Sequence, residues 1–182
     1  MTDTGQESRW VIRAQSGDDE ALDLLLKSVQ EPLFGYIQTL VRDHHRALDI
    51  LQDVFVLVIR KLYWLREPKL FRPWVYRIAS RQALLSLKRD RRSWSSSEEE
   101  SILNSVAEEP LRDADTKLLA SLPGFLQQVS PASRAVLSLH YLSEMTLQET
   151  ADILGISLSA TKSRLAYGLA TLRKQLADQS AF

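Results

Sequence analysis

Cysteine is absent from this 182-residue chain, which excludes a disulfide framework and any thiolate-ligated metal site. No apolar run approaches the length that a helix needs to cross a bilayer, and residues 1–10 lack the apolar segment of a signal peptide. These absences lead us to expect a soluble, cytoplasmic protein. The formal net charge is zero, a value that by itself hides any nucleic-acid partner.

Motifs for enzymatic chemistry are also missing. The sequence has no Gly-rich phosphate loop and no nucleophile motif, and its three histidines lack metal-ligand spacing. We interpret His44 and His45 as a solvated turn and His140 as a packed helix residue. We therefore expect no enzymatic activity, no metal or other cofactor and no small-molecule substrate.

Alternating strand patterns and internal repeats are likewise absent, whereas apolar residues recur at helical steps of three and four. We predict an all-α protein made of two small helical domains that a flexible acidic linker joins. The predicted parts are a polar N-terminal tail (1–8), a first helical domain (9–92), a Ser- and Glu-rich linker (93–115) and a C-terminal domain with a helix-turn-helix (116–182).

The first domain is predicted to begin with three short helices. The first starts at Arg9 and stops near Gly17, and the second starts at Asp18. The third begins at Pro32, because proline suits the first turn of a helix.

Two longer helices follow. We predict a break at residues 44–45, then a long helix, a loop over residues 64–69 and a last helix over residues 73–92. Apolar residues at helical steps in the long helix are Leu48, Leu51, Phe55, Val58, Ile59 and Leu62, and those of the last helix are Val75, Ile78, Ala79, Leu84 and Leu85.

The C-terminal domain is predicted to hold a helix over residues 116–129, a helix that Ser130 caps, and then two helices joined by a tight turn. Thr146 and Glu149 have capping-box spacing. Gly155 suits the left-handed end of a helix, and Ser157 can cap the next one. The final helix has an apolar stripe of Leu158, Thr161, Leu165, Leu169, Leu172 and Leu176.

Such a unit places the front of its second helix in the major groove of DNA, although an ordinary helical hairpin fits the same pattern. The side of that helix away from the apolar stripe carries the candidate DNA-binding residues Ser159, Lys162, Ser163, Arg164 and Tyr167.

Charge is strongly segregated along the chain. Residues 60–92 hold eleven Lys or Arg against two Asp or Glu, whereas residues 93–115 and 1–59 are acidic. We interpret the basic block as a phosphate-binding surface, since so much charge of one sign is costly without a counter-charge. Phe71, Trp74 and Tyr76 are interleaved with it; for each ring taken singly, burial in the core is the reading that we favour.

Four stretches of the sequence carry a family resemblance. They are GDDEA at 17–21, ALDILQDVF at 47–55, FRPWVYRIA at 71–79, and LGIS at 154–157 with KSRL at 162–165. In this order, across an acidic linker, they resemble the extracytoplasmic-function (ECF) sigma factors of bacterial RNA polymerase, and the resemblance extends from about residue 9 to residue 176.

The resemblance implies a sigma factor that binds core RNA polymerase and directs promoter-specific transcription initiation. Its partners would be the clamp helices of the largest polymerase subunit, the flap, promoter DNA and an anti-sigma factor. The implied docking residues are Asp49, Gln52, Asp53 and Phe55; the first three of these also fall on one helix side at steps of three and four.

The resemblance also assigns the promoter contacts. The last helix of the first domain would open and hold the minus-ten element, with the loop before it against a flipped-out base. The helix-turn-helix would read the minus-thirty-five element as duplex. The implied minus-ten residues are Arg72, Trp74, Arg77, Arg81 and Lys88.

Several positions depart from the usual family pattern. Arg81 stands where a base-contacting Asn is usual, and Leu85 where Asp is common. Glu144 replaces a frequent turn glycine, and Ala160-Thr161 replaces Thr-Val. We interpret these changes as altered promoter preference. The hydroxyl of Thr161 is tolerable on an apolar stripe if it bonds a carbonyl of the preceding turn.

Two alternatives stay open at this point. A helix-turn-helix regulator would bind duplex DNA without polymerase, but it would leave the N-terminal helices and the basic block unexplained. An interaction-only module would sequester a partner protein. Co-purification with core RNA polymerase discriminates these readings from a sigma factor.

Overall fold

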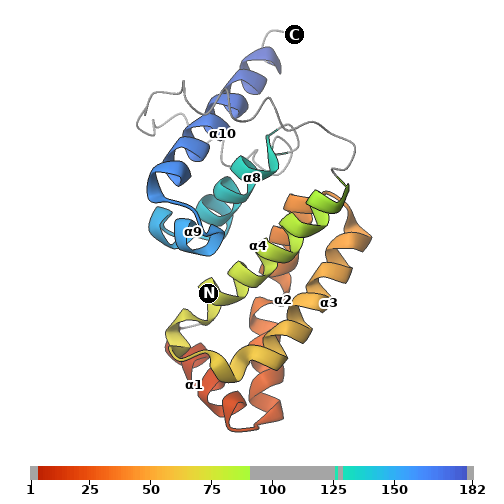
Figure 1. Ribbon diagram of the computed structural model, residues 1–182, viewed down its shortest axis with the longest axis vertical. Coiled ribbons are helices and arrows are strands. Elements are labelled where there is room, and N and C mark those ends of the chain that lie inside the picture. Colours follow the sequence, from red (N-terminus) through yellow and green to blue (C-terminus); the bar gives the residue numbers. More distant parts are fainter. Residues whose placement is uncertain (1–3, 91–125, 127–128, 180–182) are drawn as a thin grey trace. The chain divides into compact units, whose positions relative to one another are not determined.

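The computed structural model of the protein describes residues 4–90, 126 and 129–179 (Figure 1). Over this part the chain is helical and has no strand, which confirms the predicted all-α class. The chain divides into two compact units, residues 1–85 and 86–182. The predicted linker and most of the predicted helix over residues 116–129 lie outside the described residues.

The N-terminal unit is a small helical bundle with a short irregular connection. Helix α2 packs against α1 and α3, and α1 also packs against the 3₁₀ turn η2. Tyr36 of α2 and Tyr76 of α4 meet edge to face, with ring centroids 5.3 Å apart. The elements are α1 (Thr4–Gln15), α2 (Asp19–Val41), α3 (His44–Lys61), η1 (Leu62–Trp64), η2 (Pro68–Leu70) and α4 (Phe71–Asp90).

The first helix begins earlier than the sequence pattern predicts. We expected a polar tail over residues 1–8, but α1 already includes residues 4–8. The reason is tertiary: Glu7 is buried, and Val11, one helical turn later, is buried on the same side of α1. Glu7 pairs with Arg72, which is distant in the sequence, so the residues around Glu7 carry no signal of that contact.

Pro32 does not start a helix, so the predicted break between the second and third helices is wrong. Helix α2 runs without interruption from Asp19 to Val41 with Pro32 inside it. Buried residues continue at steps of three and four on both sides of Pro32. Burial of this stripe therefore outweighs the roughly 3 kcal/mol that an interior proline costs a helix. The buried residues are Ala21, Leu25, Val29, Leu33, Tyr36, Ile37, Leu40 and Val41.

Helix α3 buries only part of the apolar set expected: Leu51, Val58 and Leu62 are buried, whereas Leu48 and Ile59 are not. Its N-cap is Asp43, so His44 and His45 lie in its first turn and do not mark a break. Leu48 and Ile59 are 39% and 51% exposed. Apolar residues occur nearly all round this helix, which makes the inward face ambiguous in the sequence. The buried residues are Ala47, Ile50, Leu51, Val54 and Val58.

Helix α4 starts at Phe71, two residues before the predicted start, and its described part ends at Asp90. Pro73 lies in its first turn, where a missing N–H costs no helical hydrogen bond. Val75 and Ala79 are buried as expected, whereas Leu85 is exposed.

The C-terminal unit contains α8 (Pro131–Leu137), a π-helical turn η5 (Ser138–Leu142), α9 (Leu147–Leu154) and α10 (Leu158–Gln179). Every cap that the sequence indicated is present. The Ser130 side chain accepts from the Ser133 N–H, and Ser157 Oγ accepts from the Ala160 N–H. The core of the unit comprises Leu126, Val129, Val136, Leu137, Leu165, Leu169 and Leu172.

Two positions of the α10 stripe are informative. Thr161 is fully buried, and its hydroxyl donates to the Ser157 carbonyl at 3.0 Å, which is the bond that makes a hydroxyl tolerable there. Leu158 is 38% exposed, so it does not belong to the buried stripe.

Helices α8 and α10 approach closely at Gly168. A methyl group on Gly168 would lie 2.7 Å from Cδ1 and 3.2 Å from Cγ of the buried Leu137. Overpacking costs about 1–3 kcal/mol, against about 1 kcal/mol gained in helix propensity. We therefore expect Gly168→Ala to lower the free energy of unfolding of the C-terminal unit by roughly 1 kcal/mol, measured by urea titration.

Gly35 is the matched control. It is exposed within α2, and a methyl group at this position would have no neighbouring atom within 4 Å. Gly35→Ala should therefore raise the free energy of unfolding of the N-terminal unit by about 0.5–1 kcal/mol. If Gly168→Ala were as stabilising as Gly35→Ala, the close helix approach would be disproved.

Candidate polymerase and nucleic-acid interfaces

The exposed face of α3 carries three of the four predicted docking residues. Asp49, Gln52 and Asp53 are all exposed, and at 100° per residue they fall within one side of the helix. Phe55 is half-buried and lies at the margin of this face. The structure therefore brings together the acids and the amide but not the phenyl ring.

Apolar residues share this face, and the sequence pattern missed them. Val56 is 46% exposed and falls between Asp49 and Gln52 around the helix; Leu48 and Ile59 lie at one side. The only local signal was the excess of apolar residues over what one buried stripe needs. We call the surface formed by Leu48, Asp49, Gln52, Asp53, Val56 and Ile59 the α3 face.

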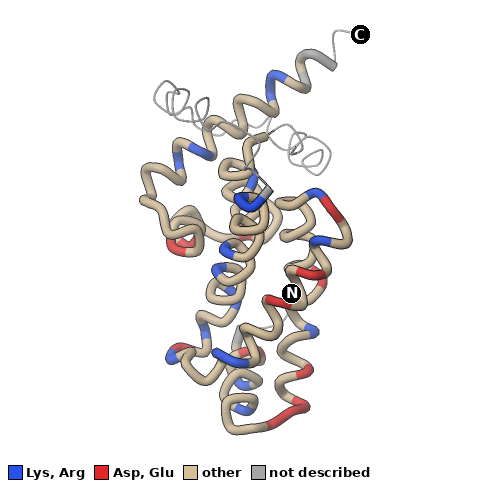
Figure 2. The backbone as a smooth tube through the Cα atoms, turned by 45° about the vertical axis from the view of Figure 1, so that its right-hand side comes forward, with Lys and Arg blue, Asp and Glu red and all other residues tan. Residues whose placement is uncertain are grey.

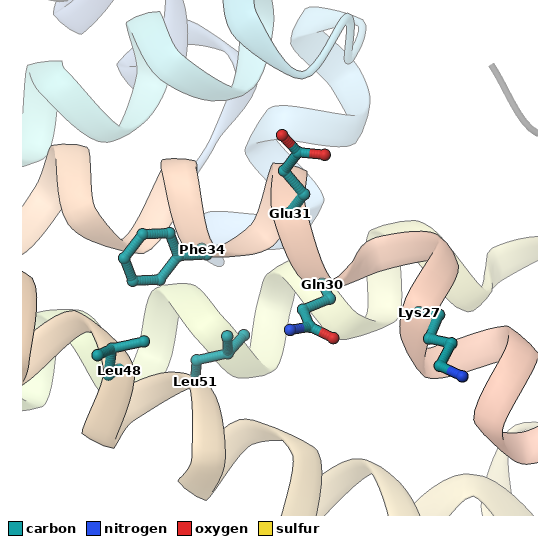
Figure 3. A pocket seen from close by; sticks show the side chains of 6 residues that line it. All are labelled: Lys27, Gln30, Glu31, Phe34, Leu48 and Leu51. Carbon is teal, nitrogen blue, oxygen red and sulfur yellow. The ribbon is translucent and has the colours of Figure 1, made fainter.

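A groove adjoins the α3 face at the seam between α2 and α3 (Figure 3). Its volume is about 320 Å³, and Phe34, Leu48 and Leu51 supply its apolar lining. Lys27, Gln30 and Glu31 supply the polar part. A partner could therefore bury an apolar side chain beside its polar contacts with the acids.

Basic residues follow one side of α4. Arg77, Arg81 and Lys88 are exposed, at steps of four and seven residues that keep them on one side of the helix. Figure 2 marks the Lys and Arg positions of the described chain in blue along the backbone. The phosphates of a nucleic-acid strand are suitable partners for such a row.

Arg72 is the exception among the predicted minus-ten residues. Its Nε donates to both carboxylate oxygens of Glu7 at 2.9 Å, and its Nη2 donates to Glu7 Oε1. These hydrogen bonds raise the pKa of the Arg72 guanidinium. The side chain is therefore engaged in a structural ion pair that joins α1 to α4.

The rings of the basic block are buried or half-buried, close to the expected burial in the core. Phe71 and Tyr76 are buried, and Trp74 is half-buried with its ring centroid 6.4 Å from that of Phe71. The Tyr36 hydroxyl lies 2.7 Å from Ser80 Oγ, and burial raises the pKa of Tyr36 well above its usual value. Most of the aromatic surface of this block therefore serves the core.

Two other rings, which were not predicted as site residues, are strongly exposed. Tyr63 and Trp64 in η1 are each 76% exposed, between the buried Leu62 and Leu65. Their ring centroids are 6.1 Å apart and their planes are nearly perpendicular. The signal was present as two adjacent aromatic residues between leucines, at the start of the predicted loop over residues 64–69. Exposed rings next to a basic helix are suited to stacking with bases.

The helix-turn-helix has the predicted local geometry. Thr146 and Glu149 form a reciprocal capping box at the start of α9, and Gly155 ends α9 in the left-handed conformation with φ 66°. The following helix, α10, is thereby directed away from α9 by a turn that its own sequence specifies.

The outward side of α10 brings the five predicted residues together. Ser159, Ser163 and Tyr167 form a central row at steps of four, and Lys162 and Arg164 flank that row. Ser159 and Lys162 are exposed, whereas Ser163, Arg164 and Tyr167 are half-buried. A row of short polar residues between two cations is suited to the edge of a duplex groove.

Comparison with known families matches both units. Residues 25–93 match the family model described as Sigma-70 region 2, and residues 125–174 match Sigma-70, region 4. The first match runs from α2 to the end of α4, and the second covers α8, α9 and most of α10.

Individual relatives agree with these matches. The ECF sigma factor SigW of Bacillus subtilis (strain 168) is 22% identical over 178 residues, which cover 92% of this chain and 95% of SigW. The sigma factor NccH of Alcaligenes xylosoxydans xylosoxydans is 29% identical, with 94% and 95% covered. The RNA polymerase sigma-H factor of Pseudomonas aeruginosa is 38% identical over 74 residues, 41% of this chain and 38% of that protein.

A solved structure shows the same fold. CnrH, in complex with the cytosolic domain of CnrY, has a TM-score of 0.69 and 23% sequence identity to this chain. The likeness covers 95% of this chain and 98% of CnrH.

Two helical units with these region matches define a transcription initiation factor of the sigma-70 type. Within that class, the chain belongs to the ECF sigma factors of bacterial RNA polymerase, which confirms the resemblance seen in the sequence. It directs promoter-specific transcription initiation, and its partners are core RNA polymerase and promoter DNA.

Proposed function

We propose a division of labour in which three surfaces perform three separate steps of initiation. The α3 face binds the clamp helices of the largest polymerase subunit. The exposed cations of α4, together with the rings of η1, hold the opened minus-ten element. The outward side of α10 reads the minus-thirty-five duplex. The observation that carries this proposal is that each surface lies on a different element and has a different chemistry.

The α3 face suits a basic, partly apolar helix. Asp49 and Asp53 provide charge that steers a cationic partner and fixes its register. Val56, Ile59 and the neighbouring groove provide apolar surface, which supplies the affinity that exposed charge pairs lack. Phe55 contributes at the margin of the contact.

The α4 surface suits a single strand. Arg77, Arg81 and Lys88 contact phosphates, while Tyr63 and Trp64 offer flat rings to unpaired bases. Trp74, which is half-buried beside Phe71, falls on the same side of α4 as these cations and adds ring surface to it. We leave Arg72 out of the DNA contacts, because its guanidinium is held by Glu7.

The decisive experiment for this function is run-off transcription. The purified chain is mixed with core RNA polymerase and genomic DNA fragments, and the RNA 5′ ends are mapped. Initiation at defined sites that depends on the added chain supports the proposal. Absence of any specific start site would exclude it.

Three further properties belong to the same proposal. We propose an anti-sigma partner, which is supported by the family and by the shared fold with CnrH, a protein solved with the cytosolic domain of CnrY. We propose that the chain acts in the cytoplasm and has no catalytic activity of its own, since sigma factors are initiation factors. None of the described helices combines the length and hydropathy needed to span a bilayer.

Arg164 tests the α10 assignment. We expect Arg164→Ala to weaken binding of the minus-thirty-five duplex about 5- to 50-fold and to reduce the slope of log affinity against log salt by about one, because one phosphate or base contact is lost. Fluorescence anisotropy at several salt concentrations measures both quantities. Lys174→Ala, an exposed cation near the other end of α10, is the matched control and should change neither quantity. An Arg164→Ala variant with the wild-type slope would contradict the assignment.

A further inference from the structure

The side chain of Gln15, the last residue of α1, bonds the turn that carries the two exposed rings. Its Nε2 donates to the Leu62 carbonyl at 2.8 Å and to the Leu65 carbonyl at 2.8 Å. Because both partners are acceptors, only the NH₂ end of the amide can face them, and both of its hydrogens are used. The residue reaches 47 and 50 positions along the chain to make these bonds.

The bonded turn has little stability of its own. Element η1 has three residues, and one backbone bond, from the Leu65 N–H to the Leu62 carbonyl at 3.0 Å, closes it. Short 3₁₀ turns have poor hydrogen-bond geometry. The two bonds from Gln15 therefore fix the carbonyls on either side of Tyr63 and Trp64.

The same helix also holds the far end of the connection. Helix α1 packs against both η1 and η2, and Glu7 of α1 pairs with Arg72 at the start of α4. Leu62 and Leu65 are buried, whereas the two rings between them are 76% exposed. The backbone is thus anchored while the aromatic side chains project from it.

We propose that Gln15 is a positioning residue for promoter opening: it holds η1 so that the rings of Tyr63 and Trp64 are ordered before unpaired bases stack on them. This inference rests on the proposed contact of η1 with the opened minus-ten strand. Ordering the turn in advance removes an entropy cost that would otherwise fall on the stacking step. Gln15 itself need not touch DNA.

The test uses the full chain in holoenzyme and a promoter fragment selected by run-off transcription with the wild-type protein. Gln15→Glu keeps the size of the side chain but replaces both donors by a carboxylate that faces two carbonyl oxygens. Gln15→Ala removes the bonds without adding charge. Gln6→Glu makes the same chemical change at an exposed position of α1 and is the matched control.

Strand opening is followed by permanganate reactivity of thymines as a function of holoenzyme concentration. For Gln15→Glu we expect the opening rate at saturation to fall about tenfold, which corresponds to losing most of the stacking of one base. The concentration for half-maximal opening, the affinity for core polymerase and the duplex binding of the helix-turn-helix should stay at wild-type values. Gln15→Ala should show the same pattern to a smaller extent, and Gln6→Glu should show none of it.

A double-variant cycle distinguishes positioning of the two rings by Gln15 from a purely structural role of Gln15. If Gln15 acts through the rings, Gln15→Glu should have no further effect on opening once Tyr63 and Trp64 are replaced by alanine. An undiminished effect in that background would overturn the inference, as would a fall in core affinity equal to the fall in opening rate. If replacing both rings leaves opening unchanged, the proposed contact of η1 fails as well, and the two failures are thereby distinguished.

Discussion

Replacing Arg72 by methionine is expected to lower the free energy of unfolding of the N-terminal unit by about 3–5 kcal/mol, because it leaves the carboxylate of Glu7 buried without its partner. The Glu7 side chain is only 4% exposed, so water cannot substitute for the guanidinium. Three of the four tryptophans, Trp10, Trp64 and Trp74, belong to this unit. Urea unfolding followed by tryptophan fluorescence therefore reports mainly on it.

Replacing Glu7, the other partner of the ion pair, should lower the free energy of unfolding by less. The Arg72 side chain is 32% exposed and can turn toward water when Glu7→Gln removes its charge partner. We expect Glu7→Gln to lower the free energy of unfolding about half as much as Arg72→Met does. The double variant Glu7→Leu with Arg72→Met should recover much of the stability lost in Arg72→Met, because a buried apolar pair carries no desolvation penalty. Strictly additive losses in the double variant would show that the ion pair is not the cause.

The helix ends of the C-terminal unit were predictable from the sequence, because the capping residues lie next to the ends that they satisfy. Ser130, Thr146 with Glu149, Gly155 and Ser157 each satisfy the ends of their own helix within four residues, and all of these caps are present. The continuation of α2 through Pro32 and the early start of α1 depend on partners distant in the chain. No helix-end signal contains that information.

The polar residues of the candidate surfaces were predictable from the sequence, whereas their exposed apolar residues were not. The spacing of Asp49, Gln52 and Asp53 sufficed to place them on one side of α3, because a solvated polar side has a period that the sequence displays. The exposure of Val56 and Ile59 could not be read, since apolar residues are normally assigned to the core. The exposure of Tyr63 and Trp64 was not predicted for the same reason, since aromatic residues are also normally assigned to the core.

The structure gives the backbone conformation or the exposure of three positions that depart from the family pattern. Glu144 has φ 55°, so a side chain occupies a left-handed turn position where glycine is unstrained. Arg81 and Leu85 are both exposed on α4, so neither substitution alters the core of the N-terminal unit. These two changes are therefore free to alter what α4 contacts, and the altered promoter preference stays an interpretation.

Asp53 is exposed on the α3 face, where a charge reversal changes the surface and leaves the core intact. We expect Asp53→Lys to weaken binding of core RNA polymerase by about tenfold or more, because a like charge now meets a basic partner and the apolar contacts around Val56 lose their register. Asp53→Asn, which removes the charge without reversing it, should weaken binding by a smaller factor. Biolayer interferometry with immobilised core enzyme measures both, with the loss seen partly in the association rate and reduced at high salt.

Two controls make this result specific. Asp19→Lys makes the same charge reversal at an exposed position of α2 outside the α3 face and should leave polymerase affinity unchanged. Duplex binding by the helix-turn-helix should be unaffected in every variant, because α10 belongs to the other unit. Wild-type polymerase affinity in Asp53→Lys would remove the α3 face from the proposed interface, even if initiation at promoters were confirmed. A loss equal to that of Asp19→Lys would mean that net charge, and not this face, governs the association.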